Sequence, residues 1–419
     1  MREKFLSLFT FEQDYFYLKV PIVFIILCKL LSNRQTTQLK FHYNRADRLM
    51  TEFIGRTKIT QLVYRPYWLS ISPFLQAATY IFSEEMNRYW KPEDFDREEI
   101  ELEDGGTVGI DWARDKGTKV GRPRREPGTK SKPILLLAPG LGGASNNLYT
   151  IALVRAARRS GFKVGTMLFR GSDGLPITSG KLSYSGAWED CKAIMEYAHR
   201  RYVSTEKSER MYAYGCSLGA QILALYMIKE GRNACRFLDG AVLYGTPWST
   251  SKGADFFYKN AFGLYQKAIG LNLSENIRKK QLPKMQPYLS EEDYAHYEKA
   301  LQENWQGMQV LDEHIFPRMF GYASTQDYYD QVTIAERATS IKVPTFALGA
   351  EDDQICGHMF APVKASQSRE SNLCLGTTQY GAHVCHMQGH FIPKPWYTKP
   401  VMEWFEFLEA RNTFSKKYN

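Results

Sequence analysis

The sequence predicts an α/β protein in which a mostly parallel sheet is covered by helices on both faces. Short apolar runs, such as residues 133–138 and 240–244, alternate with longer helix-like runs from residue 133 onward. These short runs are continuously apolar, which is typical of strands buried on both faces. The sequence G-C-S-L-G, residues 215–219, stands between a strand-like run and a helix-like run. Together these observations favour the α/β class.

Length and composition allow one large domain with additional segments. The chain has 419 residues, and 44% of its side chains are apolar, which is enough to bury one large core. Its net charge is +9, and basic residues crowd together only at residues 116–132. We expect a solvated loop there, with contact to acidic lipids as the alternative. No aromatic side chain interleaves those charges, so we expect no nucleic-acid partner.

Seven cysteines are spread along the chain, an odd number with no C-x-x-C pair. This spacing argues against a disulfide framework and against a zinc site, and it favours a reducing, intracellular compartment. The glycine-rich residues 139–143 lack the spacing of a dinucleotide site. We therefore expect neither a metal nor a cofactor.

Residues 15–31 are rich in apolar and aromatic side chains. Lys19 and Lys29 bracket only nine uncharged residues, whereas a spanning helix needs about 20. We expect this segment to associate with a membrane, as an anchor or as a helix lying in the interface. A buried strand or helix of the soluble domain is the alternative. Residues 32–56 are polar and basic and are predicted to be a linker or a surface helix.

The remaining elements follow in order along the chain. Residues 99–102 and 108–112 are strand-like and flank the turn signal Asp104-Gly105-Gly106, so they predict a hairpin. The predicted strands of the parallel sheet are residues 133–138, 162–169, 211–214, 240–244, 343–348 and 373–377, and the predicted helices among them include residues 148–159, 187–201 and 220–229.

Ser217 lies at the centre of the G-x-S-x-G sequence, at the predicted turn from strand to helix. Such a turn forms a nucleophile elbow, in which a strained backbone exposes the serine hydroxyl at the edge of the sheet. An ordinary N-cap serine is the alternative interpretation. Because an alcohol is a weak nucleophile at neutral pH, the first interpretation also requires a base and an orienting acid.

Asp353 and His383 each follow a later strand-like run. The order serine, acid, histidine is that of α/β hydrolases, so we predict Asp353 as the acid and His383 as the base. Asp352 is the alternative acid, because spacing cannot choose between adjacent carboxylates. His386 and His390 are further histidines in the same stretch, and an Asp after a strand is often only a helix cap.

The glycine-rich loop at residues 139–143 has a natural role in a hydrolase. Backbone N–H groups in this loop and directly after the nucleophile form an oxyanion hole. We predict the amides of Leu141 and Leu218 as this pair, on position alone.

A long insertion at about residues 250–340 interrupts the alternation of strands and helices. Ser290 is predicted to cap a helix that extends to about residue 304. We expect the insertion to form a helical lid over the elbow. Its aromatic residues could line an acyl pocket or form the core of the insertion itself: Phe256, Phe257, Tyr258, Phe262, Tyr265, Phe316 and Phe320.

These features together resemble the YheT-like, or AB-hydrolase-4, family of α/β hydrolases, which includes the ABHD1, ABHD2 and ABHD3 type proteins and yeast medium-chain ethyl ester synthases. The resemblance spans about residues 64–389. Its motifs are Pro66-Tyr67-Trp68, Phe74-Leu75-Gln76-Ala77, Asp104-Gly105-Gly106, Asp111-Trp112, residues 139–143, Phe169-Arg170-Gly171, residues 215–219, Thr246-Pro247-Trp248, Glu351-Asp352-Asp353 and Gly381-Ala382-His383.

The resemblance implies that Ser217, Asp353 and His383 match the nucleophile, acid and base of the family. It also implies a lipid ester as substrate and an N-terminal membrane anchor. The chain departs from the family pattern at Phe74 and Ala77, where His and Thr are usual, and at residues 384–386. These departures concern the substrate and the shape of the pocket.

We therefore expect a membrane-proximal segment and linker at residues 1–56 and an α/β-hydrolase catalytic domain at residues 57–419. The expected activity is that of a serine hydrolase of carboxylic esters, with acylglycerols or phospholipids as substrates, in a membrane-associated, intracellular location. An alcohol O-acyltransferase working at the same site is one alternative. A membrane-associated binding protein that does no chemistry is the other.

Overall fold

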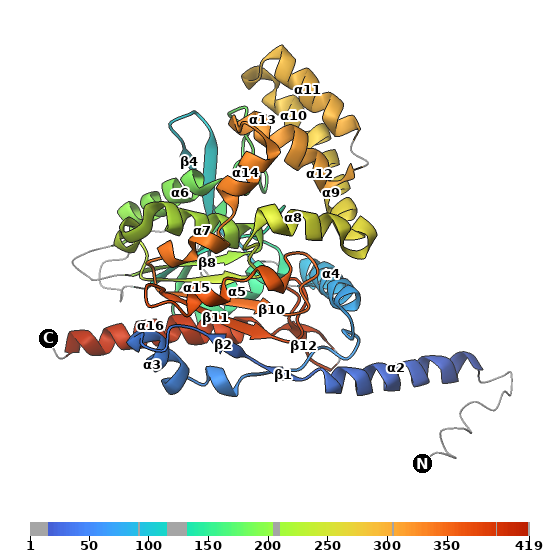
Figure 1. Ribbon diagram of the computed structural model, residues 1–419, viewed down its shortest axis with the longest axis vertical. Coiled ribbons are helices and arrows are strands. Elements are labelled where there is room, and N and C mark those ends of the chain that lie inside the picture. Colours follow the sequence, from blue (N-terminus) through green and yellow to red (C-terminus); the bar gives the residue numbers. More distant parts are fainter. Residues whose placement is uncertain are drawn as a thin grey trace.

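The computed structural model describes residues 16–90, 93–114, 132–203, 210–303, 306–390 and 392–417 (Figure 1). Within these residues, a nine-stranded sheet has the order β2-β11-β10-β9-β8-β6-β7-β5-β4. Its strands are β2 (Lys40–His42), β4 (Phe95–Glu101), β5 (Thr107–Ala113), β6 (Ile134–Ala138), β7 (Lys163–Leu168), β8 (Met211–Cys216), β9 (Gly240–Tyr244), β10 (Thr345–Ala350) and β11 (Leu373–Thr378). The basic stretch singled out above lies outside the described residues, except for Lys132.

The six central strands, β6 to β11, pair in parallel, which confirms the predicted sheet. The predicted hairpin is also present, because β4 pairs antiparallel with β5. β5 in turn runs antiparallel to β7, and β2 runs antiparallel to β11 at the opposite edge. Since the central strands are parallel, the loops at their carboxyl ends meet at one edge of the sheet.

Two hydrophobic cores cover the two faces of this sheet. Leu136 of β6 packs in the core on one face, with α6 and α7, whereas its neighbours Leu135 and Leu137 pack in the core on the other face, with α3, α5 and α16. This alternation is the two-residue period of a strand that is buried on both sides. The covering helices are α3 (Arg48–Arg56), α5 (Leu148–Arg159), α6 (Trp188–Tyr202), α7 (Leu218–Glu230) and α16 (Thr398–Lys417).

The insertion between β9 and β10 forms a mostly helical body on one side of the sheet (Figure 1). The predicted helix is α11, and the side chain of Ser290 caps it by accepting a hydrogen bond from the amide of Asp293. The helical segments of the insertion are α8 (Thr250–Lys259), η5 (Asn260–Gly263), α9 (Leu264–Asn276), η6 (Ile277–Gln281), α10 (Leu282–Met285), η7 (Gln286–Tyr288), α11 (Glu291–Gln302), α12 (Met308–Val310), η9 (Leu311–Ile315), α13 (Phe316–Phe320), α14 (Thr325–Val332) and η10 (Ala335–Ser340).

Shorter elements complete the described chain. They are β1 (Thr37–Gln38), η3 (Ile59–Gln61), β3 (Val63–Tyr64), η4 (Gly231–Arg236), η11 (His358–Phe360), α15 (Val363–Ser366), β12 (Met387–Gln388) and β13 (Lys394–Pro395).

Residues 32–56 are expected from the sequence to be a linker or a surface helix; the structure has the helix α3 at residues 48–56 and the edge strand β2 at residues 40–42. β2 extends the sheet by pairing with β11. In α3, Phe53 is fully buried and packs edge-on against Phe346 of β10 and Trp404 of α16. A strand of three residues carries little local signal, since its pairing partner lies more than 300 residues away.

The N-terminal helix α2 (Phe16–Arg34) covers most of the apolar segment that the sequence singled out. From residue 23 to residue 31, Cys28 is the buried side chain, and its neighbours are largely exposed. This exposure differs from the alternative of a helix buried in the soluble domain. Among the described residues, no helix combines the length and the apolar character needed to cross a membrane.

Candidate active site

Ser217 lies at a sharp turn between β8 and α7, as the sequence predicted. Its backbone has φ 51° and ψ −120°, a conformation that is costly for a residue with a side chain. The turn is also tight, because a Cβ on Gly219 would lie 2.2 Å from the carbonyl oxygen of Ala138. The two glycines of the motif therefore permit a strained turn that presents the Ser217 hydroxyl at the carboxyl edge of the sheet.

Three groups from three separate loops meet at this turn. The Oγ of Ser217 lies 2.8 Å from Nε2 of His383. The other ring nitrogen of His383, Nδ1, lies 2.9 Å from Oδ2 of Asp353. The histidine can thus receive a proton from the serine while its other ring nitrogen donates to the carboxylate.

Asp353 is held by its own loop as well as by His383. Its Oδ1 accepts hydrogen bonds from the amides of Ile355, at 2.9 Å, and Cys356, at 2.8 Å. Burial alone would raise the pKa of Asp353, but the adjacent His383 and these hydrogen bonds lower it below the usual value. Asp353 is therefore ionised at neutral pH.

Asp352 is close by but turns away from the histidine ring. Its Oδ1 accepts from the amide of Ala382 at 2.7 Å, and its Oδ2 accepts from Nε2 of Gln76 at 3.1 Å. Burial raises the pKa of Asp352 to about 6, although those two hydrogen bonds oppose the change. Of the two adjacent carboxylates, Asp353 contacts the imidazole and Asp352 braces the backbone just before it.

The other two histidines of this stretch have different surroundings. His386 is buried, with Nδ1 2.9 Å from the hydroxyl of Tyr244 and Nε2 2.7 Å from Oγ1 of Thr378. Burial lowers the pKa of His386 to about 3, so it is a neutral group within the core. His390 is exposed and lines a separate cavity.

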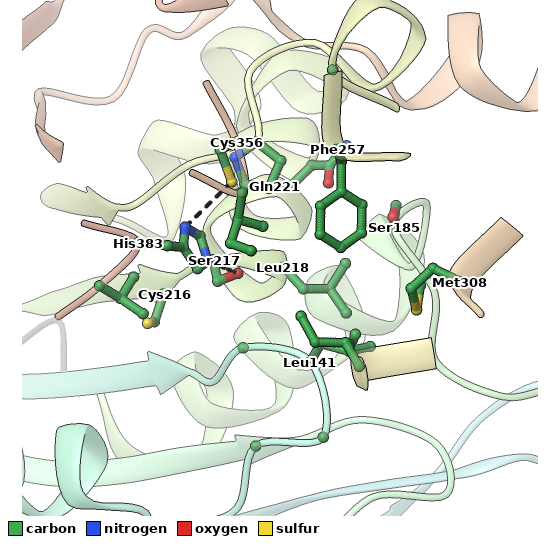
Figure 2. Close-up of a pocket in the computed structure, with 18 of the residues that line it drawn as sticks. Leu141, Ser185, Cys216, Ser217, Leu218, Gln221, Phe257, Met308, Cys356 and His383 are labelled. Carbon is green, nitrogen blue, oxygen red and sulfur yellow. Dashed lines mark hydrogen bonds between the residues drawn. The ribbon is translucent and has the colours of Figure 1, made fainter. Parts of the chain in front are cut away.

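A cavity of about 390 Å³ opens beside Ser217 and His383. Its floor is the strand edge, and its walls come from the glycine-rich loop, from α4 (Pro73–Trp90) and from the insertion. Figure 2 shows Phe257 and Met308 of the insertion close to Leu218 and Leu141. The lining is mainly apolar, and a site of this kind suits an acyl chain.

The aromatic residues of the insertion divide between the cavity and other places. Phe257, Tyr258 and Phe316 line the cavity. Phe320 instead stacks on Tyr184 with ring centroids 3.6 Å apart, and Phe262 is 94% exposed. The two possibilities that the sequence left open therefore each apply to part of the set.

Leu141 and Leu218, the predicted oxyanion pair, both line the cavity next to Ser217 (Figure 2). Across the described residues, neither of their amides donates a hydrogen bond to a backbone carbonyl outside the helices and strands. Leu218 is the first residue of α7, where helical amides have no partner within the helix. Both N–H groups are therefore available to an oxygen of a ligand.

No protein-family model matches the chain, but comparison with individual known proteins finds relatives over most of its length. The YheT protein of Escherichia coli is 27% identical over 315 residues, which cover 75% of this chain and 85% of that protein. Phospholipase ABHD3 of Homo sapiens is 22% identical over 320 residues, covering 76% and 73%. The chain has the α/β-hydrolase fold.

Two further comparisons extend this set. Medium-chain fatty acid ethyl ester synthase/esterase 2 of Saccharomyces cerevisiae is 22% identical to the hydrolase over 369 residues, which cover 75% of this chain and 79% of that protein. Among solved structures, a fungal esterase from Rhizomucor miehei is 11% identical, with a TM-score of 0.49, and covers 84% of the hydrolase and 94% of that chain.

Cys356 adds a group that sequence reasoning did not single out. Its Sγ lies 3.5 Å from Nδ1 of His383, on the side of the ring that faces Asp353. Asp353, Cys356 and His383 are close enough together to hold a metal ion. Burial raises the pKa of the Cys356 thiol well above its usual value, so the thiol is neutral at neutral pH.

Asp312 places a carboxyl group in the wall of the cavity, within the insertion. The hydroxyl of Tyr258 donates to it, and Tyr329 lies 3.5 Å from the same oxygen. Burial raises the pKa of Asp312 to about 6, although the two hydroxyls favour the carboxylate. The hydrolase thus carries a titratable group in its insertion, in the wall of the catalytic cavity.

This raised pKa makes the stability of the fold depend on pH. The folded state holds the proton of Asp312 up to about pH 6, whereas an unfolded chain releases it near pH 4. The stabilisation from this group is therefore complete below pH 4 and is lost as the pH rises through 6. We expect Asp312→Asn to gain at least about 2 °C in melting temperature relative to wild type between pH 4.5 and pH 7.5.

Melting temperatures of the two proteins at both pH values check this prediction. Asp352 titrates in the same window and is unchanged in both proteins, so subtracting the two curves removes its contribution. A difference between variant and wild type that stays constant with pH would contradict the raised pKa of Asp312.

Several residues of the site carried no usable signal in the sequence. Gln76 and Gln354 support the loop around His383, since the side-chain oxygen of Gln354 accepts from the His383 amide at 3.1 Å. Gln76 stands in one of the motifs of the family resemblance, but glutamine is not a catalytic residue type, so neither residue was given a role in the site. The sequence G-A-H after a strand indicated the histidine but not its supports.

Proposed function

We propose that the hydrolase cleaves carboxylic esters of acyl lipids, with Ser217 as nucleophile, His383 as general base and Asp353 as the orienting acid. The observation that carries this proposal is the continuous chain of hydrogen bonds from Ser217 through His383 to Asp353. It opens onto a mainly apolar cavity that is large enough for an acyl chain.

The reaction follows from the positions of these groups. Oγ of Ser217 attacks the ester carbonyl while Nε2 of His383 takes its proton. The amides of Leu141 and Leu218 hold the negative charge that develops on the carbonyl oxygen. His383 then returns the proton to the leaving alcohol, and water activated by the same nitrogen releases the acid.

An alcohol can replace water in the second step of this reaction, in which the acyl group leaves Ser217. The acyl group would then pass to the alcohol and form a new ester, which makes the same site an acyltransferase. A relative in yeast is named as both a synthase and an esterase for ethyl esters. We propose hydrolysis as the main activity and treat transfer as an outcome that the assay must measure.

We also propose that α2 associates with a membrane on its intracellular side. The support is the exposed apolar surface of this helix, where Phe24, Leu27 and Leu30 are each more than half exposed. A helix of this kind gains free energy when its apolar side chains leave water for the interface of a bilayer.

A fluorophosphonate probe tests the proposed function directly. We expect it to modify wild-type protein, and we expect peptide mass mapping to place the adduct on Ser217, with no adduct in Ser217→Ala. A separate sample of unlabelled protein is then assayed on monoacylglycerol, phosphatidylcholine and p-nitrophenyl esters, with ethanol as competing acceptor. Folded wild-type protein that stays unlabelled and hydrolyses none of these esters would favour the binding protein that does no chemistry.

A further inference from the structure

A second cavity lies at the C-terminal end of α2, separate from the catalytic cavity. Its volume is about 510 Å³, and its walls come from α2, from residues 65–68 and from the segment between β12 and β13. Direct contacts join these three parts: Oγ of Ser32 donates to the carbonyl of Pro66, and the amide of Tyr67 donates to the carbonyl of Met387. The cavity is therefore built by the fold and does not depend on one mobile loop.

The charge-bearing side chains described along this cavity are all basic, and we call it the basic cavity. Lys29, Arg65, Lys394 and His390 line it, and none of the acidic side chains that the structure describes does. The salt bridges among the described residues do not involve Lys29, Arg65 or Lys394, in contrast to Lys40, which pairs with Glu351. Three unpaired cations around one hollow repel each other, and an anion within the hollow relieves that repulsion.

The surface next to the basic cavity is apolar. On α2, which supplies Lys29, the side chains of Phe24, Leu27 and Leu30 are 51–57% exposed. On the other wall, Ile392 is 70% exposed between His390 and Lys394. A patch of exposed apolar side chains beside a cluster of cations is typical of a surface that lies on an anionic membrane.

Helix α4 continues this apolar surface. In contrast to an ordinary amphipathic helix, it buries polar side chains and exposes large apolar ones. Its buried side chains include Gln76, Thr79 and Ser83, whereas four large apolar side chains are exposed together with Ala78 and Glu85: Phe74, Ile81, Phe82 and Met86. The helix packs against β12, which helps to form the basic cavity, and Figure 1 shows α2 and α4 on the same side of the molecule. An apolar outer face is unfavourable in water and favourable against acyl chains.

These observations distinguish a lipid from a small soluble anion. A free phosphate would need the cations but would leave the apolar faces of α2 and α4 in water. A phospholipid uses both, since its phosphate carries the negative charge and its acyl chains meet the apolar helices. We propose that the basic cavity binds the phosphate group of an anionic phospholipid in the leaflet on which α2 and α4 lie. This rests on the membrane association proposed above and is independent of the hydrolase chemistry.

The position of α4 links this surface to the catalytic cavity. Tyr80 and Glu84 of α4 line the catalytic cavity, whereas Ile81 and Phe82 of the same helix are exposed on its outer side. A leaflet in contact with the outer face of α4 would therefore lie one helix away from the cavity that holds Ser217. Binding at the basic cavity would orient the hydrolase so that an ester can pass from the leaflet to the nucleophile.

The test is flotation of the full chain with vesicles of phosphatidylcholine alone and with vesicles that contain 20% phosphatidic acid or phosphatidylserine. We expect tighter partitioning onto the anionic vesicles. The variant Lys29→Gln/Arg65→Gln/Lys394→Gln should lose about 100-fold in partitioning onto anionic vesicles and little onto neutral ones. Ile81→Gln/Phe82→Gln should weaken binding to both kinds of vesicle, because it removes apolar contact only.

A matched control removes the same number of charges elsewhere. Arg232, Lys284 and Lys364 are exposed, lie on other elements and line neither cavity. The variant Arg232→Gln/Lys284→Gln/Lys364→Gln should keep the preference for anionic vesicles. An equal loss in both triple variants would mean a diffuse charge effect and would overturn the proposed site. Wild-type protein that binds neutral and anionic vesicles equally would overturn it as well.

A second arm separates the lipid from free phosphate. Calorimetric titration compares inorganic phosphate and glycerol 3-phosphate with dihexanoyl phosphatidic acid, which stays monomeric in solution. Tighter binding of the lipid, lost in the cavity variant, supports the proposal. Equal binding of all three would make the cavity a phosphate site and overturn the assignment to a lipid. Hydrolysis of a soluble p-nitrophenyl ester, measured in parallel, shows that the triple variants are folded, so a failure here is distinct from a failure of the proposed activity.

Discussion

Replacing Ser217 with alanine is expected to remove ester hydrolysis, with kcat falling by roughly 10⁶-fold. The hydroxyl is the group that forms the acyl-enzyme, and no other hydroxyl contacts Nε2 of His383 in the described part of the chain. Folding should be unaffected, because the elbow conformation is set by the backbone and by its neighbouring glycines. Initial rates on a p-nitrophenyl ester, together with the melting temperature, measure both effects.

The double variant of Ser217 and His383 provides a sharper control than either single variant. If Ser217 and His383 act as one unit, then His383→Ala should cost about as much as Ser217→Ala, and the double variant should be no slower than either. Independent contributions would instead multiply. Turnover retained in Ser217→Ala would exclude this serine as the nucleophile, whatever the double variant does.

The change Asp353→Asn is expected to lower kcat by about 10⁴-fold while leaving the binding of substrate nearly unchanged. Asparagine cannot stabilise the imidazolium, and its amide group favours the wrong tautomer of His383. Oδ1 of Asp353 also accepts two backbone amides, which the asparagine oxygen can still do, so the loop should keep its shape. Steady-state kinetics with one soluble ester give kcat and KM separately.

Asp352→Asn is the matched control for this experiment. The two carboxylates are adjacent in sequence, and both are largely shielded from water, yet Asp352 contacts Gln76 and the amide of Ala382 rather than the imidazole ring. We expect a loss of less than about tenfold, since the asparagine oxygen can still accept one of those hydrogen bonds. A larger loss in Asp352→Asn than in Asp353→Asn would make Asp352 the orienting acid.

The proposed membrane surface and the catalytic site use different parts of the same scaffold. The catalytic groups lie on loops at the carboxyl edge of the sheet, whereas the basic cavity is formed by the N-terminal helix, by residues 65–68 and by the segment from β12 to β13. Because the two sites share no residues, variants in one should leave the chemistry of the other intact. This separation allows lipid binding and ester hydrolysis to be measured as independent properties.

The sequence by itself determined the sheet, the elbow and the order of the reacting residues. Each of these depends on a local pattern: continuous apolar runs give buried strands, and glycine, serine and glycine between a strand and a helix give a sharp turn. Ser217 could therefore be placed from about 20 residues of context. The helix capped by Ser290 was likewise predictable, because a cap is a contact between residues three positions apart.

Only the tertiary structure decided which of several similar residues form the hydrogen-bonded chain that ends at Ser217. Asp352 and Asp353 are adjacent and closely follow β10, and the turn of the loop directs Asp353 to His383 and Asp352 to Gln76. His386 was excluded in the same way, by its burial against Tyr244. These choices depend on contacts between residues that are tens to hundreds of positions apart in the chain.

The same reason explains the surfaces that the sequence did not predict. The pairing of β2 with β11 joins segments more than 300 residues apart, so no local pattern indicated this three-residue strand. That α4 buries polar side chains and exposes apolar ones becomes clear only from the fold, in which Gln76 points inward and Phe82 points outward. Local sequence patterns specify the type of each element, whereas the direction that a side chain faces is set by long-range packing.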